Sequence, residues 1–207
     1  MKTSPLSYMP NRSQTQLTFH KLSEKDLSLI VKSLKSKSSH GSDLISSRVL
    51  KVILPQILKP LMHIINLSLE SGMVPHFYKL VKVLPIYKAD RHNVFSNYHP
   101  ISLLSVFSKI LEKAACSQIL SYFVVNKLLY QHQYGFRLGH STEHALLQFT
   151  ENIFSALNQN QYNISVFIDL KKAFDTVSHS IPLQKSDYYG IRCSTLDWVR
   201  SYLADRQ

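Results

Sequence analysis

Cysteine and acidic residues are scarce in this sequence of 207 residues. Cys116 and Cys193 are its only cysteines, too few for a disulfide framework or a zinc site, and we expect both to be small, reduced core residues. The acidic residues number 13 against 24 Lys and Arg, which gives a formal net charge of +11. This excess favours polyanionic partners such as nucleic acid or an anionic membrane, although charge alone leaves open a protein that is simply basic.

Long hydrophobic runs are also missing. No apolar stretch approaches the length of about 18 residues that a membrane-spanning helix needs, and residues 1–16 lack the apolar stretch of a secretory signal. We therefore expect an intracellular protein, in the cytoplasm, the nucleus or both, with no membrane partner. Because 44% of the residues are hydrophobic, the chain can bury a core, and no repeat or linker marks a second domain.

Hydrophobic spacing and capping residues predict a chain rich in helices. Residues 1–20 are polar and expected to be loosely ordered, whereas residues 21–207 are expected to form one folded part. Helices are predicted from Ser23, over 44–69, over 106–123, from Ser141 or Thr142, and over 196–203. Pro55 and Pro60 are expected to break the second of these into two helices. The helix from Ser141 or Thr142 is expected to bury the face formed by Leu146, Phe149, Ile153 and Leu157. Strands are predicted over 79–88 and from Ile164.

Residues 164–175 read ISVFIDLKKAFD and place a carboxylate directly after an apolar strand signal. An unpaired charge at the end of a buried strand is costly, so Asp169 there needs a partner. Taken alone, the pattern also fits a strand whose charge emerges into solvent at a sheet edge.

A series of stretches resembles the reverse transcriptase of non-LTR (LINE-type) retrotransposons, in the order of that family. They are GSDLIS (41–46), VLPIYK (83–88), NYHPISLLS (97–105), SKILEK (108–113), QYGFRLGHST (133–142), FIDLKKAFDTVSH (167–179), YGI (189–191) and WVRSYLADRQ (198–207). The resemblance implies an RNA-directed DNA polymerase that uses an RNA template, a DNA primer and deoxynucleotide triphosphates. It implies an α+β fold, a partial right-hand polymerase with helix-rich fingers and an incomplete palm sheet beginning at the strand from Ile164.

The resemblance also implies roles for individual residues. Asp169 stands where the family carries a catalytic carboxylate that binds Mg2+, an ion that prefers hard oxygen ligands. Phe174 matches the aromatic residue that excludes a ribose 2′-OH, and Ala173 would leave the backbone open to the triphosphate; a core position for Phe174 stays open. Arg137 and Lys88 match basic positions near the incoming nucleotide or the template, and each also fits a solvated surface charge.

The sequence departs from the family pattern in four ways. His99 stands where the family usually has arginine, and Pro182 and Ser186 stand where leucines form a helix, which is expected to break it. The Tyr/Phe-Ala-Asp-Asp hairpin of the second metal site and the Gly-rich stretch before it are not found, and neither are a thumb or an endonuclease domain.

We therefore expect the N-terminal half of a polymerase, truncated before its second metal-binding motif and inactive alone, with a missing C-terminal half as one candidate partner. Two alternatives stay open. One is a non-catalytic basic fragment that binds nucleic acid, and the other is a transposon relic without a selected role.

Overall fold

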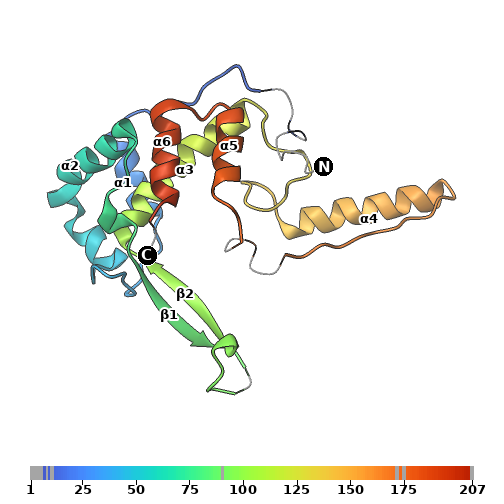
Figure 1. The fold of residues 1–207 in the computed structure, drawn as a ribbon, viewed down its shortest axis with the longest axis horizontal. Coiled ribbons are helices and arrows are strands. Elements are labelled where there is room, and N and C mark those ends of the chain that lie inside the picture. Colours follow the sequence, from blue (N-terminus) through green and yellow to red (C-terminus); the bar gives the residue numbers. More distant parts are fainter. Residues whose placement is uncertain are drawn as a thin grey trace. The chain divides into compact units, whose positions relative to one another are not determined.

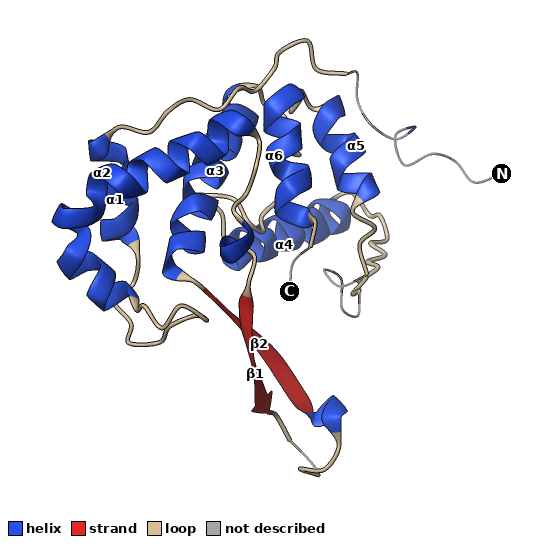
Figure 2. Ribbon diagram, turned by 60° about the vertical axis from the view of Figure 1, so that its left-hand side comes forward, coloured by secondary structure: helices blue, strands red, loops and turns tan. Residues whose placement is uncertain are grey.

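The structure is a computed structural model that describes residues 7, 9 and 12–205 apart from residues 90, 171, 172, 174 and 175. Its elements are α1 Glu24–Ser33, α2 Ser47–Ser71, the short 3-10 turn η2 His76–Tyr78, β1 Val81–Tyr87, the 3-10 turn η3 Phe95–Asn97, β2 Tyr98–Leu104, α3 Val106–Val125, α4 Thr142–Asn158, α5 Ser180–Tyr188 and α6 Cys193–Leu203 (Figure 1). This helix-rich chain with a small sheet agrees with the α+β class predicted from sequence (Figure 2). It divides into two compact units, one of Met1–Tyr122 with Ser178–Gln207 and the other of Phe123–Val177.

Helix α1 begins where its capping residue predicts. Ser23 is the N-cap, its Oγ accepts the Asp26 N–H at 3.2 Å, and its own N–H donates to Asp26 Oδ2 at 2.9 Å. This reciprocal pair satisfies N–H groups that have no partner within the helix. Leu27 and Val31 are buried one turn apart, as the apolar spacing predicted.

The same capping pair makes the stability of α1 depend on pH. Hydrogen bonds from the side chain and the backbone of Ser23 hold the pKa of the Asp26 carboxyl below its ordinary value of 3.8. A lowered folded-state pKa stabilises the fold above the ordinary value, and that stabilisation is lost as the pH falls through the folded pKa. We expect Asp26→Asn to lower the free energy of unfolding at neutral pH, and the difference from the wild type to shrink below about pH 4. Urea titrations across pH 2–7 measure this, with Glu24→Gln in the same helical turn as the control.

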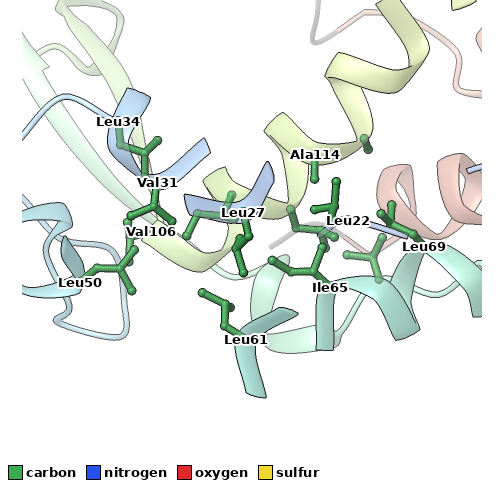
Figure 3. Packing of buried hydrophobic residues seen from close by; sticks show 14 of the residues in the cluster. Leu22, Leu27, Val31, Leu34, Leu50, Leu61, Ile65, Leu69, Val106 and Ala114 are labelled. Atoms are coloured by element: carbon green, nitrogen blue, oxygen red, sulfur yellow. The ribbon is translucent and has the colours of Figure 1, made fainter. Parts of the chain in front are cut away.

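The hydrophobic core belongs to the first unit and joins α1, α2, α3 and α6. Leu27 of α1, Ile65 of α2 and Ile110 of α3 are completely buried, and Trp198 of α6 is 3% exposed. Figure 3 shows leucine and isoleucine side chains of α1 and α2 gathered with Ala114 of α3. Burial on this scale is what stabilises these helices, since their intrinsic propensities alone are marginal.

Helix α2 runs unbroken through both of its prolines, so the predicted break is wrong. A proline inside a helix removes one backbone hydrogen bond, but Pro55 and Pro60 are both exposed, where water can satisfy the carbonyl groups left without a donor. The opposite face holds the helix in place through Leu50, Leu61, Ile65 and Leu69, all buried. The helix ends at Gly72, which has a φ of 71° and fits the predicted stop.

Length and apolar composition would allow α2 to cross a membrane. Such a segment was not expected from the sequence, because prolines and polar residues interrupt the apolar run of α2. The buried face of α2 packs into the core with α1 and α6, which is also the behaviour of a core helix in a globular unit.

Strands β1 and β2 form an antiparallel hairpin that extends away from the helices of the first unit (Figures 1 and 2). The strand predicted over 79–88 is confirmed as Val81–Tyr87. Pro85 and Pro100 are paired with each other across the two strands. Because proline has no N–H group, the two missing hydrogen-bond donors lie at the same residue pair.

Two further predictions about the first unit differ from the structure. Residues Ser180–Tyr188 form α5 despite Pro182, because the proline lies in the first turn, where its missing N–H has no helical partner anyway. Cys116 and Cys193 are free thiols as expected, but both are exposed rather than in the core.

The second unit buries much less apolar surface. Helix α4 begins after its predicted cap Ser141, but none of its residues is buried, and Leu146 and Leu157 are 63% and 61% exposed. The predicted buried face of this helix is therefore wrong. Residues 161–170 form neither helix nor strand, so the predicted strand from Ile164 is wrong as well. A strand needs a neighbour for its backbone hydrogen bonds, and within the described residues β1 and β2 pair only with each other.

Candidate nucleic-acid interface

Asp169 lies in the extended stretch 161–170 of the second unit, surrounded in sequence by exposed apolar side chains. Phe167 and Ile168 are both 83% exposed, and the segment is held at Phe167, whose ring centroid lies 5.7 Å from that of Phe149 on α4. Asp169 is exposed and has no hydrogen bond or ion pair in the described part of the chain. Its carboxylate is therefore exposed rather than buried at the end of a strand.

Arg137 lies in the loop between α3 and α4 and is half-buried. Its Nη1 donates to the carbonyl oxygens of Tyr130 at 3.3 Å and Gln131 at 3.4 Å, so the side chain links two parts of this loop. A guanidinium has five N–H donors, and the Nε and Nη2 groups have no acceptor among the described residues. They can donate to a phosphate while Nη1 keeps the loop in place.

Two large apolar side chains flank Arg137. Phe136 and Leu138 are each 88% exposed, and His140 N–H donates to the Arg137 carbonyl at 3.3 Å, which closes the turn. The exposed ring of Phe136 beside a cation is the combination that stacks bases and contacts the backbone of single-stranded nucleic acid. Phe136 was expected to pack within the loop, and its exposure shows that this prediction is wrong.

Lys88 belongs to the first unit and directly follows β1. Its side chain is exposed, and its N–H donates to the Asn97 carbonyl at 2.9 Å, which ties the two ends of the connection between β1 and β2. Tyr87 stacks on His92 with ring centroids 3.9 Å apart, and Phe95 is 94% exposed. The hairpin end therefore presents aromatic and basic side chains together.

Ala173 and Phe174 follow Asp169 in the second unit. Ala173 is half-buried and its carbonyl accepts the Thr176 hydroxyl at 3.3 Å, which makes a local turn. Phe174 lies outside the described residues, so its role in excluding a 2′-OH stays a prediction.

Among the described residues, no group of three or more His, Cys, Asp or Glu side chains could hold a metal ion. Asp169 has the hard oxygen that Mg2+ prefers, but a single carboxylate does not make a site for it. Asp169 was predicted as one carboxylate of an incomplete Mg2+ site, and its binding of the ion stays a prediction.

A sequence model of the family "Reverse transcriptase (RNA-dependent DNA polymerase)" matches residues 86–207, more than half of the chain. The chain belongs to the reverse transcriptase family. The part of the chain that matches the family contains every site residue predicted above, from Lys88 to Phe174.

Curated relatives of this chain are encoded by mobile elements, which confirms the predicted non-LTR family. The chain is 33% identical over 184 residues to the "Probable RNA-directed DNA polymerase from transposon BS" of Drosophila melanogaster, covering 86% of this chain and 20% of the relative. It is 28% identical over 180 residues to the "RNA-directed DNA polymerase from mobile element jockey" of the same species, with the same two coverages. A third relative, from the type-1 retrotransposable element R2 of Popillia japonica, is 23% identical over 189 residues, covering 91% of this chain and 25% of the relative. The chain thus spans about a fifth to a quarter of the length of these relatives.

Two of the reverse transcriptase motifs pack directly against each other. Gly41 of GSDLIS lies close to the backbone of NYHPISLLS. If another residue replaced Gly41, its Cβ would lie 2.6 Å from the Ser105 backbone nitrogen, which is too close. Asp43 accepts the Ser105 hydroxyl and also the Ile45 N–H, the latter at 3.1 Å. This carboxylate therefore joins two motifs of the first unit, a structural role that the sequence analysis did not assign.

Proposed function

We propose that this chain forms the fingers and the beginning of the palm of an RNA-directed DNA polymerase from a non-LTR retrotransposon, acting inside the cell in the cytoplasm, the nucleus or both. Its partners would be an RNA template, a DNA primer and deoxynucleotide triphosphates. The observation that carries the proposal is the family match over residues 86–207, because it spans Asp169 and the basic residues together.

Lys88 and Arg137 are the proposed contacts to template or nucleotide phosphates. Arg137 has the geometry of a positioned cation, since two carbonyl oxygens hold its Nη1. Lys88 is exposed at the end of the hairpin. Its ammonium group is a point charge on a flexible side chain, so it can contact a phosphate in more than one position.

Asp169 is proposed as one ligand of a Mg2+ site completed by carboxylates outside this chain. The apolar side chains around it support this, because Ile164, Val166 and Ile168 are 89%, 79% and 83% exposed. An exposed apolar segment with unpaired backbone is a surface that another strand can cover. The relatives are about four to five times longer than the segment that matches this chain, and their additional residues could supply strands that cover this surface.

The 207-residue chain alone should bind RNA without extending a primer. We expect its affinity for a short single-stranded RNA to fall steeply with salt, because each phosphate neutralised by Lys or Arg adds about 0.7 to the slope of log K against log salt. Fluorescence anisotropy at several salt concentrations measures this, and primer extension on an RNA template with Mg2+ is run beside it.

Each arm of this experiment has an outcome against the proposal. RNA binding that is absent, or independent of salt, would remove the nucleic-acid interface. Primer extension by this chain alone would show that the metal site needs no carboxylate from elsewhere.

A non-catalytic fragment that binds RNA or DNA is the second candidate. The formal charge of +11 and the lack of a three-residue metal group within the described part of the chain favour it. It predicts the same salt-dependent binding, but no effect of Asp169 on any polymerase that contains this segment.

A further inference from the structure

A pocket of about 210 Å³ lies in the first unit, where the loop between α1 and α2 meets the end of β2 and the start of α3. Lys35, Lys37 and His40 line it from the loop and Lys109 lines it from α3, whereas none of its lining residues is acidic. Three lysine side chains that line one small cavity, with no acidic residue among the lining residues, favour an anion there.

The three lysines are available for such an anion. Lys35 and Lys37 are exposed and Lys109 is half-buried, and none of their ammonium groups has a hydrogen bond or ion pair in the described residues. Lys51 shows the contrast, because its Nζ donates to the Lys32 carbonyl at 3.2 Å at the end of α1 and so supports the helix.

The loop that carries Lys35 and Lys37 is held in place by hydrogen bonds of its backbone. Ser47 Oγ donates to the Lys35 carbonyl at 2.8 Å and accepts the Lys37 N–H at 2.9 Å. On the far side of the loop, His40 and Ser46 pair as an isolated antiparallel bridge. The lysine side chains thus project from a backbone that is already arranged, which reduces the entropy lost on binding.

The start of α2 adds to the positive potential of the pocket. Ser47 is the first residue of this 25-residue helix, it lines the pocket, and the first turn carries no acidic side chain. The N-terminal end of a helix has a partial positive charge that favours anions. It supplements the three lysines and is not the basis of the site.

We propose that this pocket binds a phosphate group, supplied by the backbone of a single-stranded nucleic acid or by free phosphate. A cavity of about 210 Å³ is smaller than the usual small-molecule site, so it suits a phosphate rather than a whole nucleoside triphosphate. The site is independent of the proposed role of Asp169 and can fail or hold separately from it.

Lysine acetylation of the wild-type chain tests the site without any substitution. We expect a short single-stranded RNA to protect Lys35, Lys37 and Lys109 from acetylation at least about threefold more than Lys25 and Lys59, as measured by mass spectrometry. Lys25 and Lys59 are exposed lysines of the same unit, and Lys59 lies about three turns along α2 from the pocket.

Inorganic phosphate is the second probe. Protection by RNA alone identifies a nucleic-acid backbone site, and protection by millimolar inorganic phosphate identifies a site for free phosphate; both support the proposal. Equal modification of all five lysines with either probe would overturn it.

A pair of charge-matched variants gives an independent measurement. We expect Lys35→Gln with Lys37→Gln to weaken RNA binding about fivefold or more and to lower the salt slope by about 0.7, since the contact to one phosphate is lost. Lys25→Gln with Lys59→Gln removes the same charge and should change the affinity less than about twofold. Both pairs are exposed, and Lys35 and Lys37 bond to Ser47 through their backbone, so circular dichroism should show an unchanged helix content. Equal weakening by the two pairs would mean that only net charge matters and would refute the pocket.

Discussion

Asp169→Asn is expected to abolish RNA-directed primer extension in a chimera of the Drosophila melanogaster jockey polymerase whose matched segment is replaced by this chain. The substitution keeps the size of the side chain and removes the negative charge that a divalent cation requires. Loss of a residue that merely supports a metal ligand costs about 10–100-fold, so loss of a ligand itself should lower kcat by more than about 100-fold.

The matched control is Glu151→Gln, which neutralises an exposed acid on α4 in the same unit as Asp169. We expect this variant to keep at least about half of the chimera's activity. Primer extension is measured on an RNA template with Mg2+, together with RNA affinity by anisotropy. If Asp169→Asn keeps more than a tenth of the activity of the chimera with the wild-type segment, Asp169 does not have the proposed role.

The features predicted correctly from sequence are those fixed by a few neighbouring residues. Ser23 and Ser141 cap the helices that they were expected to cap, and Gly72 ends α2 in the left-handed conformation. Each of these signals acts within one turn of the chain, so no distant residue can override it easily.

The errors come from features that depend on distant parts of the chain. Pro55 and Pro60 break an isolated helix, but in α2 the burial of Leu61 and Ile65 outweighs the lost backbone bonds. The strand from Ile164 has the right composition, yet a strand exists only with a hydrogen-bonded neighbour. The composition of a segment therefore gives only its preference for the β-conformation, and a hydrogen-bonded neighbouring strand determines whether it forms a strand.

The candidate site was predicted from the family resemblance, and its residues differ in how far the structure describes them. Arg137 is described with its hydrogen bonds, whereas Phe174 is outside the described residues. Asp43 was missed because its function is to accept the Ser105 hydroxyl, a contact over 62 positions of sequence that spacing alone does not reveal.

Trp198→Ala should destabilise the first unit more than any substitution on its surface. Trp198 is 3% exposed, its Nε1 donates to Ser68 Oγ at 3.1 Å, and its ring lies between those of Phe19 and Tyr202 at 5.6 and 5.4 Å. Removing a buried indole leaves a cavity that these neighbours can fill only partly, so we expect a loss of about 3–5 kcal/mol.

Trp198→Phe is the matched variant, because it keeps an aromatic ring in the core and removes the hydrogen bond to Ser68. We expect it to cost about 1–2 kcal/mol, and Arg200→Ala, at an exposed ion pair with Asp197, to cost less than about 0.5 kcal/mol. Urea unfolding followed by far-UV circular dichroism compares the three variants, and the fluorescence of the single tryptophan follows the first unit in the wild type. A cooperative wild-type transition that Trp198→Ala shifts to lower urea would count against a relic without a stable fold. A wild-type chain without such a transition would favour the relic, because the core around Trp198 would then not hold the first unit together.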